Sequence, residues 1–323
     1  MVLASRRVAH VTDSGADYLI RLDNRSPDLY FRLMLNSELV ESFPTASEVL
    51  PTLRYVEYHL VEHCNLSCQR CGHFSPLAKP GFSDPEAFAR DLRQLATHFS
   101  TIKEIRLLGG EPLLHPTPEA FVDIAHVVFP NSDLRIVTNG TLLKSMRDSF
   151  WEACRRADVT LDFSMYPIME KGRTQLEELC AREHVKINVN RYTAFLAGIN
   201  PHGDSDPVKS MAYCRKQFYC PFLSNSRLYV CGLPATVHYF NDKFNRTIPD
   251  DPGIDIFDPA LDGHRILQLL KTPVETCRFC SCLYEAHPWK STRFHQAEEY
   301  DVSQATRDRV ASEGGLRSVA DHS

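Results

Sequence analysis

The sequence predicts an α/β fold in which parallel strands are joined by helical crossovers. Segments with the two-residue period of strands alternate with segments of helical spacing from residue 54 to about residue 190. Such alternation favours parallel strands with right-handed crossovers. The 323-residue chain is also 43% hydrophobic, which is enough for one large core or two domains.

The first predicted strand is 54–64, where every second residue from Val56 to Leu60 is apolar. A helix is predicted over 83–100, because Ser83 stands three residues before Glu86 in a capping pattern and apolar residues then recur at helical spacing. Further strands are predicted at 103–112, 133–140, 158–165 and 185–190, and further helices at 117–129, 145–157 and 174–183.

The alternation ends near residue 191, and the last third of the chain reads differently. The stretch 200–210 is predicted to be a loop, and 218–231 a hairpin that turns at Asn225–Ser226. A short helix is predicted at 261–272. From about residue 290 the chain is polar, and we expect a frayed tail there.

Charge and hydropathy argue against several classes of protein. The formal net charge of −5 and the lack of a basic run argue against nucleic-acid binding as the main activity. No stretch approaches the roughly 18 apolar residues of a membrane helix. The first twenty residues lack the apolar core of a signal peptide. We therefore expect a cytoplasmic protein with no nucleic-acid or membrane partner.

Eleven cysteines indicate metal ligation, because disulfides are rare in a reducing compartment and unnecessary at this size. Cys64, Cys68 and Cys71 form a C-x3-C-x2-C row on one short loop. Three thiolates can hold three irons of a [4Fe–4S] cube and leave the fourth iron open. The alternative is a zinc site shared by Cys68–Cys71 and Cys277–Cys280, which leaves Cys64 unexplained.

Active sites of parallel α/β folds lie at the carboxyl ends of the strands. The cysteine loop follows the first predicted strand, GGEP (109–112) ends the second, TNG (138–140) ends the third, and Ser164 lies at the end of the fourth. We therefore expect these motifs to converge on one site.

The sequence CNLSCQRC (64–71) resembles the cluster loop of the radical S-adenosylmethionine (radical SAM) superfamily. GGEP, TNG and Ser164 resemble motifs at successive strand ends of that family, and the resemblance covers residues 54 to 190. It implies a partial (β/α)6 TIM-like barrel. It also implies that S-adenosylmethionine is bound by Gly109, Gly110, Glu111, Asn139 and Ser164.

One position departs from the family pattern. The family usually carries an aromatic residue before the third cysteine, near the adenine, whereas this chain has Arg70. A guanidinium plane can also stack on a base, and Phe74 is a second candidate for the adenine contact.

The resemblance implies a chemistry as well. S-adenosylmethionine chelates the open iron, and its reductive cleavage gives a 5′-deoxyadenosyl radical that removes a hydrogen atom from the substrate. The electron comes from an external donor such as flavodoxin or ferredoxin. The cofactor carries the difficult step, while the protein orients the reactants and excludes solvent.

The cysteines of the last third resemble the twitch auxiliary-cluster domain, a shortened relative of the SPASM domain, with Ser226 where full SPASM domains usually have glycine. The resemblance implies that a second [4Fe–4S] cluster is held by Cys214, Cys231, Cys277 and Cys280, with Cys220 as the rival of Cys214. A structural zinc is the alternative. Cys220 and Cys282 are candidate hydrogen-atom donors, whereas Cys154 and Cys180 are expected in the core.

The predicted organisation is an N-terminal extension (1–50), the radical SAM partial barrel (51–205), the twitch/SPASM-like domain (206–290) and a polar C-terminal tail (291–323). The favoured function is epimerisation or dehydrogenation at a carbinol carbon of a carbohydrate-like, aminocyclitol or aminoglycoside substrate. The alternatives are maturation of a ribosomally made peptide and a non-catalytic metal-binding protein. Molybdenum-cofactor synthesis fits poorly, because those enzymes end in glycine-arginine and this sequence ends in VADHS.

Overall fold

The structure is a computed structural model that describes residues 8–13, 16–21 and 50–312, without the side chains of 8–13, 16–21, 216, 217, 282, 283 and 310–312. The chain divides into two compact units, Met1–Pro51 and Thr52–Ser323. In the first unit, β1 (Val8–Asp13) pairs with β2 (Ala16–Arg21) as an antiparallel hairpin. The rest of the predicted N-terminal extension lies outside the described residues, except 50.

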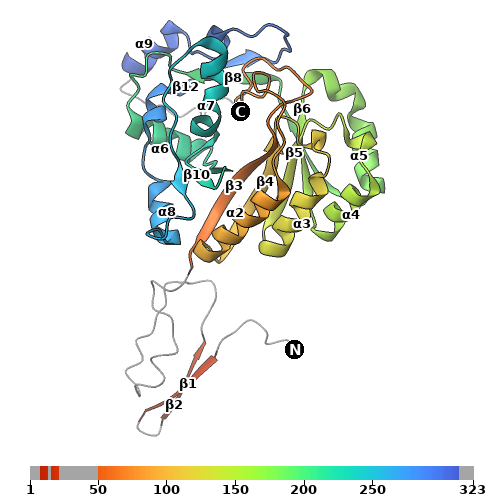
Figure 1. Cartoon of the computed structure of the whole chain (residues 1–323), viewed down its shortest axis with the longest axis vertical. Helices are drawn as coiled ribbons and strands as arrows, with labels where there is room; N and C mark the ends of the chain where they lie inside the picture. The colour runs from red at the N-terminus through yellow and green to blue at the C-terminus, as the bar shows by residue number, and fades with distance from the viewer. Residues whose placement is uncertain (1–7, 14–15, 22–49, 313–323) are drawn as a thin grey trace. The chain divides into compact units, whose positions relative to one another are not determined.

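The second unit is built on a parallel sheet whose strands follow chain order. These strands are β3 (Thr52–Val61), β4 (Thr101–Gly109), β5 (Asp133–Thr138), β6 (Thr160–Met165) and β7 (Lys186–Arg191). The connecting helices are α2 (Pro85–His98), α3 (Pro118–Val128), α4 (Asp148–Arg156) and α5 (Arg173–Arg182). Figure 1 shows these helices packed along the sheet. The predicted α/β fold is confirmed, and the topology is consistent with a partial barrel.

Three short strands extend the sheet beyond β3. They are β9 (Phe222–Ser224), which runs parallel to β3, β10 (Arg227–Tyr229) and β11 (Ile254–Asp255). The predicted hairpin is therefore present, with antiparallel pairing of β9 and β10. Its turn residues Asn225 and Ser226 have φ of 50° and 61°, as hairpin turns with two left-handed residues require.

The buried carboxylate of Asp91 supports this turn. It accepts hydrogen bonds from the Ser226 amide (3.1 Å) and the Ser226 hydroxyl (2.8 Å). Because these bonds compensate for a left-handed backbone, the structure accommodates serine where the resemblance expects glycine.

The cap of α2 differs from the prediction by one residue. Asp84, not Ser83, is the cap, and its carboxylate accepts from the amides of Glu86 and Ala87. The hydroxyl of Ser83 instead donates to the carbonyl of His59 at 2.6 Å, which ties the start of α2 to β3.

The remaining elements lie C-terminal to the parallel strands. They are β8 (Ala194–Ile199), α6 (Pro207–Gln217), α7 (Gly232–Phe244), α8 (Gly263–Leu269), β12 (Cys280–Pro288) and α9 (Gln304–Ser312). β12 pairs antiparallel with β8. Figure 1 shows α6, α7 and α8 on the β3 side of the sheet, opposite α4 and α5.

Two expectations for this region were wrong. The predicted loop at 200–210 contains the start of α6, which the carboxylate of Asp206 caps. The expected polar tail is packed around Tyr300 and Val302, which are only 3% and 1% exposed, whereas its end at 313–323 lies outside the described residues. These two apolar side chains lie among polar neighbours, so composition alone concealed their burial.

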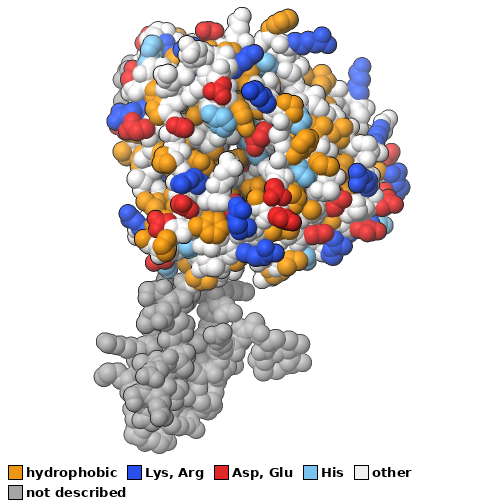
Figure 2. Space-filling model, viewed as in Figure 1, with side chains coloured by type: hydrophobic (Ala, Val, Ile, Leu, Met, Phe, Trp, Pro, Cys, Tyr) orange, Lys and Arg blue, Asp and Glu red, His pale blue; other side chains and the backbone are white. Residues whose placement is uncertain are grey.

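The main core lies between the sheet and its helices and includes Cys154 and Cys180 as small buried residues, as predicted. A second apolar cluster gathers Phe74, Phe240 and Tyr300. On the face in Figure 2, acidic and basic side chains are interspersed. Within the described part of the chain, no helix has both the length and the apolar character to cross a membrane.

Candidate active site

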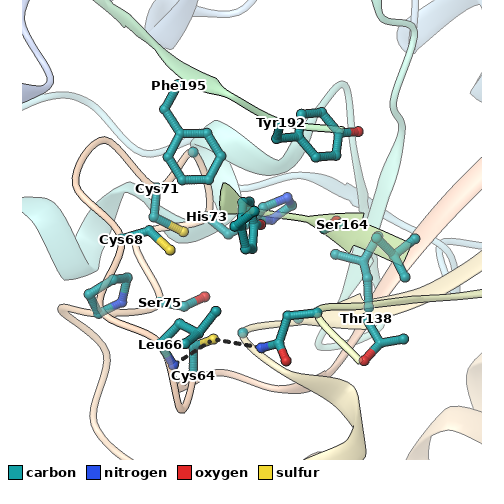
Figure 3. A pocket seen from close by; sticks show the side chains of 18 of the residues that line it. Cys64, Leu66, Cys68, Cys71, His73, Ser75, Thr138, Ser164, Tyr192 and Phe195 are labelled. Atoms are coloured by element: carbon teal, nitrogen blue, oxygen red, sulfur yellow. Dashed lines mark hydrogen bonds between the residues drawn. The ribbon is translucent and has the colours of Figure 1, made fainter. Parts of the chain in front are cut away.

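A cavity of about 280 Å³ lies at the carboxyl ends of the parallel strands. Cys64, Cys68 and Cys71 line it from the loop after β3, and Ser164 lines it from the end of β6. Figure 3 shows these four side chains around the same space. Gly109, Gly110 and Asn139 also line it. The structure thus brings together motifs from four separate strand ends.

Two of the three cysteine sulfurs receive hydrogen bonds from defined N–H groups. The amide of Leu66 donates to Cys64 Sγ at 3.3 Å, and Asn139 Nδ2 donates to the same sulfur at 3.9 Å. Figure 3 draws both bonds as dashed lines. The indole Nε1 of Trp289 donates to Cys68 Sγ at 3.3 Å.

The third sulfur, Cys71, is surrounded in the same way. Burial raises the pKa of the Cys71 thiol, while the amides of His73, Ser75 and Phe74 and the Ser75 hydroxyl lower it. Burial also raises the pKa of Cys64 to about 12 and of Cys68 to about 11.

Such thiols lose their protons when a metal binds, and nearby N–H donors then stabilise the thiolates. The three cysteines therefore fit the three protein ligands of a [4Fe–4S] cube. The alternative zinc site shared with Cys277 and Cys280 is not supported, because those two residues line a different cavity. In the described residues, no three His, Cys, Asp or Glu side chains are placed to hold a single metal ion.

The two glycines of GGEP are required by a close approach of backbones. A Cβ at Gly110 would lie 1.9 Å from the carbonyl oxygen of His63, and one at Gly109 would lie 2.2 Å from that of Val61. The Gly110 amide donates to this same Val61 carbonyl at 2.8 Å. The glycines therefore let the end of β4 dock against the start of the cysteine loop.

Glu111 does not line the cavity, although the sequence placed it among the S-adenosylmethionine contacts. Its carboxylate is fully buried and accepts from Thr138 Oγ1 (2.6 Å), the Asn139 amide (2.8 Å) and the Leu113 amide (3.1 Å). Burial raises its pKa to about 7, although these three hydrogen bonds act to lower it. Glu111 thus ties the GGEP turn to the TNG turn.

Phe74 also lies elsewhere than expected. Its ring packs on Phe240 and Tyr300, with ring centroids 5.5 and 5.3 Å away, and contributes to a second cavity. Arg70 lines the second cavity too. The aromatic residues that line the cysteine cavity are Tyr166, Tyr192 and Phe195. Tyr166 follows Ser164 by two residues, and this spacing was the available sequence signal for an aromatic residue at the end of β6.

The second cavity has a volume of about 720 Å³ and is lined by five of the cysteines from the last third of the chain. They are Cys214 of α6, Cys220 and Cys231 on either side of the hairpin, Cys277, and Cys280 at the start of β12. Burial raises the pKa of Cys220 and Cys231 well above the ordinary thiol value. The side chain of Cys282 lies outside the described residues.

The two cavities have a shared wall, formed by Glu57, Gly72, His73, Arg106, Tyr192 and Phe195. This wall was not predicted from the sequence. Its polar residues lie on the adjacent strands β3 and β4 or on the cysteine loop. The only hint in the sequence was that these two strands carry charged residues between their core residues. The charge pattern alone did not show which strand face borders a cavity.

The polar groups of the shared wall are held by neighbours. Glu57 Oε1 accepts from the Tyr55 hydroxyl at 2.6 Å, and burial raises the pKa of Glu57. Arg106 pairs with Glu104 at 2.6 Å.

The third polar group of this wall is a histidine. His73 Nδ1 lies 2.9 Å from His59 Nε2, whose ring in turn pairs with Glu62 at 3.1 Å. Burial lowers the pKa of His73 to about 3, so its imidazole is neutral at neutral pH.

Comparison with known proteins agrees with this geometry. Residues 58–166 match the family model described as "Radical SAM superfamily". The chain is 25% identical over 176 residues to GTP 3',8-cyclase of Aliarcobacter butzleri, a match that covers 50% of this chain and 52% of the relative. It is 25% identical over 273 residues to GTP 3',8-cyclase of Nautilia profundicola, covering 79% of this chain and 85% of the relative.

A third relative is GTP 3',8-cyclase of Microcystis aeruginosa, 31% identical over 118 residues, or 33% of this chain and 34% of the relative. The chain thus spans about half the length of the Aliarcobacter relative and about a third of the Microcystis one. Among solved structures, BtrN in complex with AdoMet and 2-DOIA has a TM-score of 0.41 at 15% identity, covering 71% of this chain and 92% of that chain.

Proposed function

We propose that this chain, which contains a radical SAM domain over residues 58–166, is an enzyme acting on a carbohydrate-like, aminocyclitol or aminoglycoside substrate. The reaction is hydrogen-atom abstraction from a carbinol carbon, followed by epimerisation or dehydrogenation. One observation carries the proposal: the cavity of Cys64, Cys68 and Cys71 and the cavity of the five later cysteines meet at the shared wall. A substrate at this wall would lie between both sets of cysteines.

The first cavity would hold the radical-generating group. Cys64, Cys68 and Cys71 would bind a [4Fe–4S] cluster, and Gly109, Gly110, Asn139 and Ser164 line the space for S-adenosylmethionine. When bound, these groups supply a 5′-deoxyadenosyl radical, which accepts the hydrogen atom. The half-buried aromatic surface of Tyr166 and the fixed glycine turn would exclude water and orient the ligand.

The second cavity would hold an auxiliary [4Fe–4S] cluster on Cys214, Cys231, Cys277 and Cys280. All four line this cavity together with Cys220, so five thiols are available for four ligand positions. Cys280 Sγ also lies 3.4 Å from the Tyr284 hydroxyl, a hydrogen-bond partner for a ligand sulfur.

The shared wall supports a substrate rich in hydroxyl or amino groups. Glu57 accepts hydrogen bonds, Arg106 donates them, and neutral His73 can do either. A nucleoside triphosphate would need several cationic partners. In the described lining of the two cavities, Arg70 and Arg106 are the basic residues besides histidine, and Glu104 offsets the charge of Arg106 while leaving it N–H groups to donate.

Cys220 favours epimerisation over dehydrogenation. Its raised pKa keeps the thiol protonated at neutral pH, and a protonated thiol beside the substrate can return a hydrogen atom to a carbon radical. The thiyl radical left behind would regain an electron from the auxiliary cluster and a proton from water. If the fifth thiol is a cluster ligand instead, the substrate radical would pass one electron to the auxiliary cluster and its hydroxyl proton to water, and so become a ketone. Cys282 remains the other proposed donor.

A second candidate is cyclisation of a purine nucleotide, because the curated relatives reported above carry the name GTP 3',8-cyclase. The composition of the shared wall disfavours this candidate. The two functions also predict different substrates. A single panel experiment therefore separates them.

The experiment is an anaerobic incubation in deuterated water with reductant, S-adenosylmethionine and a panel of inositols, aminocyclitols, aminoglycosides and GTP. Mass spectrometry reads the products. An isomer one mass unit heavier, with deuterium on carbon, indicates epimerisation through an exchangeable thiol. A product two units lighter indicates dehydrogenation. Turnover of GTP alone would replace the proposed function with the second candidate.

A further inference from the structure

The segment that follows β12 pairs with the cysteine loop. The Gln69 amide donates to the Lys290 carbonyl at 2.9 Å, and the Thr292 amide donates to the Ser67 carbonyl at 2.8 Å. Cys68 and Ser291 form the antiparallel bridge between these bonds. A part of the chain expected to be a polar tail thus holds the loop that carries the three cysteines.

Side chains reinforce the pairing. Ser67 Oγ lies 2.9 Å from His295 Nε2, and His295 Nδ1 lies 2.7 Å from Glu299 Oε1. The same Glu299 oxygen accepts from the Arg70 amide at 3.4 Å. His295 and Glu299 side chains are 6% and 7% exposed, so this network is shielded from water.

Trp289 is held in place by contacts other than its indole N–H. Its backbone amide donates to the Thr193 carbonyl at 2.8 Å. Its ring stacks on Tyr166, with centroids 5.6 Å apart and planes 14° from parallel. With the ring fixed in this way, Nε1 points at Cys68 Sγ, 221 residues away in the sequence, at 3.3 Å.

We propose that Trp289 is a positioning residue that tunes the [4Fe–4S] cluster of the cysteine loop, an inference that rests on the proposed function. A hydrogen bond to a ligand sulfur stabilises negative charge, and the reduced cluster carries one more negative charge than the oxidised one. The indole N–H therefore stabilises the reduced form more and raises the midpoint potential. It makes the cluster easier to reduce.

A merely structural role makes a different prediction. A half-buried indole N–H needs an acceptor, and Cys68 could serve only as that acceptor. In that case removal of the N–H would change stability but leave the potential where it is. The midpoint potential therefore separates the two roles.

The test compares Trp289→Phe with Trp151→Phe in the full-length, anaerobically reconstituted protein. Phenylalanine keeps an aromatic ring against Tyr166 and the backbone bond to Thr193 but lacks the donor. Trp151, the chain's other tryptophan, is buried on α4 and is the matched control. The readout is a redox titration of the electron paramagnetic resonance signal that changes when S-adenosylmethionine is added, since the open-iron cluster binds it.

The expected result is a more negative midpoint potential in Trp289→Phe, with wild-type iron content, and no shift in Trp151→Phe. An unchanged potential in Trp289→Phe would overturn the inference and leave the proposed function standing. A wild-type protein with no S-adenosylmethionine-sensitive signal would overturn both.

A second measurement needs no variant at position 289. Protein containing Trp151→Phe is labelled with indole-¹⁵N tryptophan, so that Trp289 carries the only label. Pulsed magnetic resonance of the reduced cluster should detect coupling to this nitrogen. Absence of coupling in cluster-loaded protein would contradict the hydrogen bond itself.

Discussion

Single side chains give the cysteine loop and the shared wall different chemistry. The cysteine loop gathers thiols and N–H donors, whereas the shared wall offers Glu57, Arg106 and His73. Glu57 is the acidic residue of this wall, and Tyr55 orients one of its oxygens. A substrate hydroxyl or ammonium group would therefore meet a carboxyl group that is already held in position.

Glu57→Gln should reduce product formation without stopping radical generation. The amide keeps an acceptor for the Tyr55 hydroxyl, but its N–H2 group replaces the second carboxyl oxygen and leaves a substrate donor without an acceptor. That loss is worth about 10- to 100-fold. Product formation should fall by about that factor, while substrate-free 5′-deoxyadenosine formation stays at the wild-type rate. Chromatography quantifies both products.

Asp133→Asn is the control for Glu57→Gln, because Asp133 pairs with Arg135 and lines neither cavity. It should leave both rates unchanged. Equal product formation by Glu57→Gln and wild type would remove Glu57 from the substrate site.

Glu111 should make stability depend on pH in a specific window. Its pKa is 4.5 when exposed and about 7 in the folded protein. Its contribution to the free energy of unfolding is therefore complete below pH 4.5 and is lost as pH rises to about 7. The loss amounts to roughly 3 kcal/mol at most. Glu111→Gln should remove this slope from the difference between the two unfolding profiles.

Chemical denaturation of metal-free protein at pH 5 and pH 8 measures the effect. Wild type should lose more unfolding free energy between these values than Glu111→Gln does. The variant should also be less stable at both, because a glutamine amide would face an N–H donor now bound by the carboxylate. Parallel profiles would contradict the shifted pKa.

At the scale of elements, hydrophobic periodicity predicted the segments whose partners are neighbours in sequence. Every strand and α-helix from β3 to β7 was predicted, with boundaries within a few residues, because these elements bury apolar faces in one core. The short 3-10 helices between them were not predicted. β8 and β12 were missed. They pair with each other from distant parts of the chain, so their local pattern says little about their burial. The helix α7 was missed as well.

The hairpin of β9 and β10 yields a prediction at this scale. Ser226→Gly loses the hydroxyl bond to Asp91 but relieves the left-handed backbone, whereas Ser226→Ala loses the bond and keeps the strain. The free energy of unfolding of Ser226→Ala should therefore be about 1 kcal/mol lower than that of Ser226→Gly. Urea denaturation of the two variants checks the order, and a more stable alanine variant would contradict it.

For the whole molecule, the sequence motifs located the site but not its surroundings. Cysteines, glycines, Asn139 and Ser164 converge as expected, because parallel strands end at one edge of the sheet. Phe74 and Glu111, expected at the S-adenosylmethionine site, do not line the cysteine cavity, since the sequence does not show which way a loop side chain turns. The shared wall and Trp289 depend on long-range packing, which a local pattern does not reveal.

The most direct test of the central claim is anaerobic formation of 5′-deoxyadenosine from S-adenosylmethionine by reduced, cluster-loaded protein. Wild type should form it, and so should Cys154→Ala, which changes a buried core cysteine. Cys64→Ala should form none while retaining about four irons at the second cavity. Undiminished 5′-deoxyadenosine from Cys64→Ala, or none from cluster-loaded wild type, would contradict a radical SAM centre at the cysteine loop.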